Sequence, residues 1–188
     1  MKDQRLPPHP FYLFTEFQSD LGILIREIED VIAWAAEVGD GRRKRQLTRI
    51  AILYVAFAAQ SAIELRASAG RMTKKFNEFE NNRIQGKQIG FPAQGRTKQL
   101  RRILDRTKWA RNMIAHPYRA DAEGRDRPMN LAESFRLEQA AAELTQLAAE
   151  VNLLKDAYRE LYDWFGQAMV AGATRTDWLG GGNFRTRF

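Results

Sequence analysis

Hydrophobic residues recur every three or four positions along most of the chain, which is the spacing of one buried face of an α-helix. The first such segment begins near Phe14 and stops at Gly39, where a Gly-Asp-Gly sequence interrupts the pattern. The positions expected to face the core in this segment are Phe14, Phe17, Leu21, Leu24, Ile28, Val31 and Ala35. The spacing therefore predicts a long amphipathic helix at the start of the fold.

Three more segments repeat this periodicity. The second runs from about Gln46 to Phe76, and its expected core positions are Ile50, Leu53, Tyr54, Phe57, Ser61, Leu65 and Met72. The third runs from about Thr97 to His116, with a stripe of Leu100, Ile103, Leu104, Thr107, Ala110 and Ile114. The fourth is a sustained heptad seam of Ala140, Leu144, Leu147, Val151, Leu154, Tyr158, Leu161 and Phe165. No segment shows the alternation of a strand.

Four long helices predict an all-α, up-down four-helix bundle over residues 14–170. We expect residues 1–13 to form a flexible leader and residues 171–188 a flexible, glycine-rich tail. Between the second and third helices the segment Asn77–Arg96 predicts a long loop.

The up-down topology places the end of the third helix at the same end of the bundle as the turn between the first two helices. Arg42, Arg43, Lys44 and Arg45 cluster at that turn, and we call these four residues the basic cluster. Arg119 follows the third helix and adds to the same end. The sequence thus predicts one positively charged end of the bundle.

The composition of the chain excludes several kinds of functional site. The chain of 188 residues has no cysteine and two histidines, so neither a disulfide framework nor a thiolate or histidine-rich zinc site is expected, and we expect no cofactor. A net charge of +7 favours binding to a polyanionic partner such as RNA. The longest apolar run, Ile50–Ala59, is about half of a bilayer-spanning length, so we expect a cytoplasmic protein without a membrane partner.

The stretch with a chemical pattern is Arg111-Asn112-Met113-Ile114-Ala115-His116 at the end of the third helix. Arg111 falls at the centre of the apolar stripe, where a guanidinium needs a partner, while Asn112 and His116 share another face with Trp109. Pro117 favours departure from the helix at His116. A structural role is the alternative: His116 would cap the helix, and Arg111 would snorkel or pair with an acid, the candidates being Glu37, Glu133 and Glu138.

An Arg-Asn-x-x-x-His sequence that ends the third helix of a basic, cysteine-free helical bundle resembles the HEPN superfamily, whose signature is an arginine, four to six residues and a histidine. The resemblance implies a metal-independent endoribonuclease, a toxin or phage-defence context, and a homodimer whose two motifs face each other. It also implies that Arg111, Asn112 and His116 are the catalytic residues.

The chemistry is consistent with these residue types. Cleavage of RNA by its own 2′-hydroxyl needs a proton acceptor, a proton donor and positive charge at the phosphate, which imidazole and guanidinium supply. One histidine per chain supplies one of the two proton-transfer groups, so we expect the homodimer to present two copies of His116 in one cleft. Arg111 would bind the phosphate, and Asn112 would orient the imidazole or the phosphate.

His116-Pro117-Tyr118 also resembles the His-x-Tyr continuation found in HEPN–nucleotidyltransferase toxin–antitoxin pairs. That resemblance implies that a nucleotidyltransferase antitoxin attaches AMP to Tyr118. The chain departs from those toxins in its length, its Asn77–Arg96 insertion and the sequence after the tyrosine. Tyr118 is otherwise a base-stacking or packing residue. The residues expected to contact RNA are Arg42, Arg43, Lys44, Arg45, Tyr118 and Arg119.

Two other functional classes fit the same sequence. The bundle could be a non-catalytic module that binds RNA or a protein through its basic end. Alternatively, it could sense a nucleotide or second messenger in a defence complex.

Overall fold

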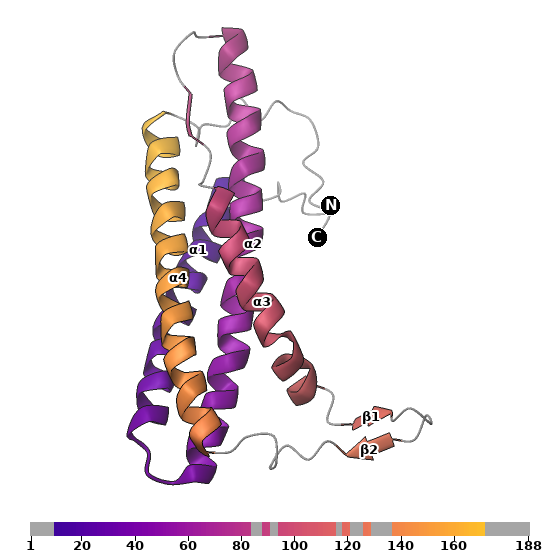
Figure 1. Cartoon of the computed structure of the whole chain (residues 1–188). Helices are drawn as coiled ribbons and strands as arrows, with labels where there is room; N and C mark the ends of the chain where they lie inside the picture. Colours follow the sequence, from indigo (N-terminus) through magenta and orange to yellow (C-terminus); the bar gives the residue numbers. More distant parts are fainter. Residues whose placement is uncertain are drawn as a thin grey trace, which may run out of the picture.

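The computed structural model describes residues 10–83, 88–90, 94–115, 118–120, 126–128 and 137–171, with side chains in 16–78, 88–90, 95–107 and 141–171. Four helices make up most of this part of the chain: α1 (Pro10–Glu37), α2 (Gly41–Arg83), α3 (Gln94–Ala115) and α4 (Leu137–Val170). They form the predicted all-α bundle, in which consecutive helices run in opposite directions (Figure 1).

Most members of the predicted stripes of α1 and α4 are buried or half-buried, and the side chains of Phe14 and Ala140 lie outside the described residues. The buried members of the α1 stripe are Leu21, Ile28, Val31 and Ala35, and α1 packs against both α2 and α4. The buried members of the heptad seam of α4 are Leu144, Leu147, Val151, Leu154 and Leu161. One α1 prediction is wrong: Phe17 is 48% exposed. Its neighbour Gln18 is buried instead, because the buried side of α1 at this level lies about one residue further around the helix.

The predicted stripe of α2 is also partly wrong, since Ile50 and Phe57 are 39% and 54% exposed. The residues buried in their place are mostly small: Ala51, Ile52, Val55, Ala56, Ala58, Ala59 and Ala62. α2 packs against all three other helices. A helix with three neighbours buries a wide arc, and alanines in that arc let the neighbouring backbones approach closely.

α2 carries an apolar window of 18 residues with a mean hydropathy of 1.4, long and apolar enough to cross a membrane. Half of that window is buried inside the bundle. The core helix of a soluble bundle has the same length and composition, so this window is weak evidence for a membrane span.

The connection between α2 and α3 is shorter than the predicted Asn77–Arg96 loop. α2 continues to Arg83, and α3 begins at Gln94. The side-chain amide of Asn77, on α2, accepts a hydrogen bond from the N–H of Ile89 in the connection and donates one to the Ile89 carbonyl, both at 3.0 Å. This pair of bonds fixes the segment Gln88–Gly90 beside α2, so that the chain has turned back along the bundle before α3 begins (Figure 1).

A short hairpin, which the sequence pattern did not predict, follows α3. Strand β1 (Tyr118–Ala120) pairs antiparallel with β2 (Asp126–Pro128). The hairpin lies away from the bundle, beyond the C-terminal end of α3 (Figure 1). Strands of three residues are too short to show a periodic signal.

α3 buries Leu100, Ile103 and Thr107 as expected and leaves Leu104 half-buried. Its last turns slant away from α2 and α4 toward the hairpin (Figure 1). Ala110 and Ile114 lie in these turns, and their side chains are outside the described residues. The candidate motif therefore lies where α3 diverges from the other helices.

Candidate functional site

The motif begins in the last turns of α3. Arg111 and Asn112 are part of the helix, which ends at Ala115. His116 lies outside the described residues, as do the side chains of Arg111 and Asn112. Tyr118 and Arg119 are the first two residues of β1. The structure thus gives the backbone setting of the motif, a helix end followed at once by a hairpin, while the contacts among its side chains stay a prediction.

The level that the motif reaches along the bundle follows from a contact at the start of α3. The Arg66 Nε donates a hydrogen bond of 3.4 Å to the Thr97 Oγ1, which sets these two positions side by side. Because α2 and α3 are antiparallel, Ala115, which is 18 residues after Thr97, lies level with Thr48, which is 18 residues before Arg66. At the rise of an α-helix, Thr48 is about 5 Å along α2 from the basic cluster. The end of α3 thus points to the same end of the molecule as that cluster (Figure 1).

Charged side chains hold α3 against α4. The Arg96 guanidinium contacts Glu160 at 3.0 Å and Asp156 at 3.5 Å. One end of Glu160 also accepts a bond of 2.6 Å from Arg66, whose side chain is 3% exposed. These contacts join the start of α3 to both α2 and α4.

A second charged contact lies ten residues further along α3. The Arg106 guanidinium donates from Nε and Nη2 to the two carboxylate oxygens of Glu150, at 2.5 and 2.6 Å, and from Nη1 to Glu143 at 2.7 Å. Burial on its own lowers the pKa of Arg106, but the hydrogen bonds and charges of Glu150 and Glu143 outweigh it, so the pKa is raised above its ordinary value. Arg106 is therefore a structural cation.

The sequence analysis did not single out Arg66, Arg96 and Arg106. A signal was present, because Arg96 and Arg106 are separated by the same number of residues as Glu150 and Glu160. Two antiparallel helices with matched spacings of opposite charge can form two bridges. The pattern does not say which of several arginines on α3 would turn toward α4.

The basic cluster occupies the first turns of α2. Arg42 and Arg43 are exposed, and Lys44 and Arg45 are half-buried. Asp40 caps the helix, since its carboxylate accepts a bond of 2.8 Å from the Arg42 N–H. Positive side chains at a helix N-terminus oppose the helix dipole and each cost a few tenths of a kcal/mol or more. The cluster is thus poorly placed for helix stability and well placed to attract an anion.

The hairpin brings two more arginine positions together. In its register Arg119 lies directly opposite Arg127. Directly opposed positions of an antiparallel pair are neighbours on the sheet. This juxtaposition begins three residues after His116 in the sequence.

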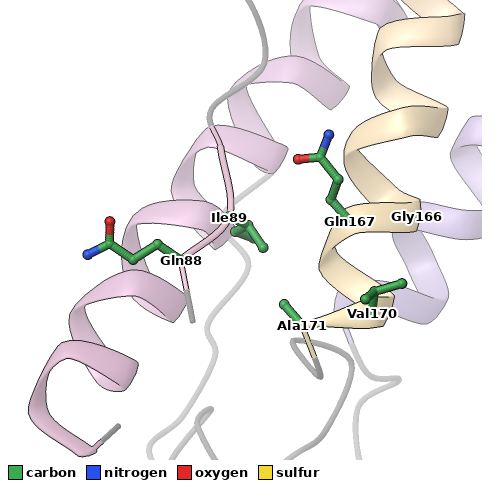
Figure 2. A pocket seen from close by; sticks show the side chains of 6 residues that line it. All are labelled: Gln88, Ile89, Gly166, Gln167, Val170 and Ala171. Carbon is green, nitrogen blue, oxygen red and sulfur yellow. The ribbon is translucent and has the colours of Figure 1, made fainter. Parts of the chain in front are cut away.

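A hollow lies at the other end of the molecule, between the segment Gln88–Gly90 and the last turns of α4. Figure 2 shows its lining residues, which are Gln88, Ile89, Gly166, Gln167, Val170 and Ala171. None of these six has an acidic, basic or nucleophilic side chain. The described lining of the hollow therefore offers no group for acid–base or nucleophilic catalysis.

Among the described residues, no group of three or more His, Cys, Asp or Glu side chains is arranged to hold a metal ion. Comparison of the chain with protein-family models, with curated proteins and with solved structures found no match.

Proposed function

We propose that this protein is a metal-independent endoribonuclease of HEPN type, acting in the cytoplasm as a homodimer in a toxin–antitoxin or phage-defence context. One observation carries the proposal: the Arg111-Asn112-x-x-x-His116 motif ends the third helix of an all-α four-helix bundle. The helical context matters because an arginine and a histidine at this spacing are common in unrelated sequences.

The proposed reaction is the attack of a ribose 2′-oxygen on the adjacent phosphorus. The bond from the 2′-oxygen to phosphorus forms while the bond from phosphorus to the 5′-oxygen breaks. One His116 imidazole takes the proton of the 2′-hydroxyl, and a second, protonated imidazole gives a proton to the departing 5′-oxygen. The products are a 2′,3′-cyclic phosphate and a 5′-hydroxyl. An imidazole with an unperturbed pKa near 6.5 can serve in either state at neutral pH.

The requirement for two imidazoles is why the proposal includes a homodimer. A two-fold arrangement that brings the two α3 ends together supplies one His116 and one Arg111 from each chain. Arg111 stabilises the charge that develops on the phosphate through its planar, two-pronged guanidinium. Asn112 orients the imidazole or the phosphate.

The rest of the RNA would be held by positive groups at the same end of the bundle. These are the basic cluster on α2 and Arg119 on β1, with Tyr118 available for stacking on a base. The register that places position 119 opposite position 127 brings a second arginine of the sequence to this hairpin. Tyr118 is alternatively the position at which a nucleotidyltransferase antitoxin would attach AMP.

The test is RNA cleavage by the purified protein in EDTA, with the product ends analysed by mass spectrometry. The wild type should yield 2′,3′-cyclic phosphates. His116→Ala should abolish cleavage without changing the helical circular dichroism, and His9→Ala, which removes the chain's other histidine, should cleave normally. Cleavage by His116→Ala would contradict the assignment.

A second candidate function is a non-catalytic module that binds RNA or a protein. The basic cluster favours it independently of the motif, because four cations at a helix N-terminus attract an anion whether or not chemistry follows. RNA binding without cleavage, unchanged in His116→Ala, would support this alternative.

A further inference from the structure

The cations of α3 fall into two groups with different environments. Arg96 and Arg106 face α4, and each is paired with carboxylates there. Lys98, Arg101 and Arg102 are exposed and form no ion pair or hydrogen bond among the described residues. We call the surface formed by these three residues the outer face of α3.

The outer face is compact and lies before the motif on the same helix, with the exposed Asp105 between the two. Lys98 and Arg102 are one turn apart, about 6 Å along the helix axis, and Arg101 lies between them. Asn112 is eleven residues after Arg101, which at 3.6 residues per turn places the two positions within about 20° of each other around the helix. The unbroken helix thus places Lys98 and Arg101 within about 40° of the Asn112 position and about 16–21 Å before it, with Arg102 about 80° around the helix from it.

The carboxylates of α1 make the opposite side of the bundle less favourable for an anion. On α1, the exposed carboxylates are Glu16, Asp20, Glu27, Asp30 and Glu37. α1 packs against α2 and α4 and lies behind them in Figure 1, whereas α3 lies in front of α2. A polyanion is therefore repelled from the α1 side and attracted to the α3 side.

We propose that the outer face of α3 binds the phosphodiester backbone of a single RNA strand and directs that strand along the helix to the motif. The proposal rests on the proposed function for its ligand and adds the binding surface and the path of the substrate. Three cations within about 6 Å along one helix can contact neighbouring phosphates of one strand. Contacts of this kind carry no sequence preference.

The test is the binding of a fluorescent 2′-O-methyl RNA of about fifteen nucleotides, which has no free 2′-hydroxyl and is not cleaved by the proposed reaction. The variant is Lys98→Gln/Arg101→Gln/Arg102→Gln. The matched control removes three other exposed or partly exposed cations, as Arg26→Gln/Lys74→Gln/Arg159→Gln. Both variants have the same net charge and keep the Arg96 and Arg106 pairs.

For the α3 variant we expect affinity about 10–100-fold weaker at 0.1 M salt and a slope of log K against log salt smaller by about 2, since each phosphate contact on a single strand contributes about 0.7. The control should bind within about threefold of wild type. Equal losses in the two variants, or an unchanged salt slope in the α3 variant, would overturn the proposal.

The same experiment separates this proposal from the proposed function. If the wild type does not cleave RNA but only the α3 variant loses binding, the outer face is the binding surface and the nuclease assignment is wrong. If the wild type cleaves RNA and the α3 variant binds like the control, the nuclease assignment is retained and the outer face is not the path of the substrate.

Discussion

Arg106 of α3 and Glu150 of α4 form a two-pronged ion pair, with the Glu150 side chain 4% exposed and the Arg106 side chain 28% exposed. Loss of Arg106 would leave the Glu150 carboxylate buried without its main counter-charge. This relationship gives the first prediction.

Arg106→Ala should lower the free energy of unfolding by about 1–3 kcal/mol, the usual cost of a buried polar group left without its partner. The partial exposure of Arg106 to solvent keeps the expected loss below that of a fully buried pair. Urea denaturation measures it as a lower midpoint with an unchanged slope. Arg101→Ala on the same helix is the control, and it should change stability by no more than about 0.5 kcal/mol. Equal effects of the two substitutions would contradict the structural role of Arg106.

The second prediction concerns Arg111. If its guanidinium binds the scissile phosphate, Arg111→Lys should fold normally and lose activity by on the order of a hundredfold or more, because an ammonium keeps the charge without the two-pronged geometry. Arg26→Lys is the control: it makes the same change at an exposed position of α1, away from the motif, and should retain activity. Fully active and stable Arg111→Ala protein would show that Arg111 has neither a catalytic nor a structural role.

The third prediction tests whether two chains share one site. Arg111→Ala and His116→Ala should each be inactive, and a refolded mixture should recover part of the activity if one chain supplies the arginine and the other the histidine. Sedimentation should show a species of twice the 21.7 kDa chain. A monomer that cleaves RNA would disprove the shared site.

The fourth prediction compares two glycines inside helices. A Cβ added at Gly22 of α1 would lie 3.0 Å from the Tyr158 hydroxyl of α4, whereas one added at Gly70 of α2 meets nothing within 4 Å. Gly70→Ala should therefore raise the free energy of unfolding by about 0.5–1 kcal/mol, the helical preference for alanine. Gly22→Ala should give no such gain, because Tyr158 must move. The same stabilisation in both variants would mean that α1 and α4 do not approach closely at Gly22.

The success of the sequence analysis differed between helices for physical reasons. The seam of α4 was predicted almost completely because its core positions are large aliphatic residues at strict heptad spacing. The predicted core face of α2 is rotated relative to the observed one, because large apolar side chains such as Ile50 and Phe57 dominate the hydrophobic pattern. The helix has three neighbouring helices and buries mainly alanines instead. Alanine contributes little to a hydrophobic pattern even where close packing requires it.

The contacts and the position of α3 could not be predicted from the sequence pattern. The ion pairs between α3 and α4 depend on which arginines the orientation of α3 turns toward α4. The connection before α3 was predicted too long because α2 continues through the residues after Asn77. The motif was found because its spacing is local. The geometry among Arg111, Asn112 and His116 depends on the path after the helix end, which helical periodicity does not determine.

The hydrogen bonds between Asn77 and Ile89 determine where along α2 the third helix begins. Without the return of the connection along α2, α3 would start beside Arg83, and its last residue would be level with position 62. With the return, Thr97 lies beside Arg66 and the last residue is level with position 48, about 21 Å nearer to the N-terminus of α2. The number of residues between Asn77 and Thr97 therefore sets where α3 ends, so adding or removing residues there would relocate the motif relative to the basic cluster without altering either sequence.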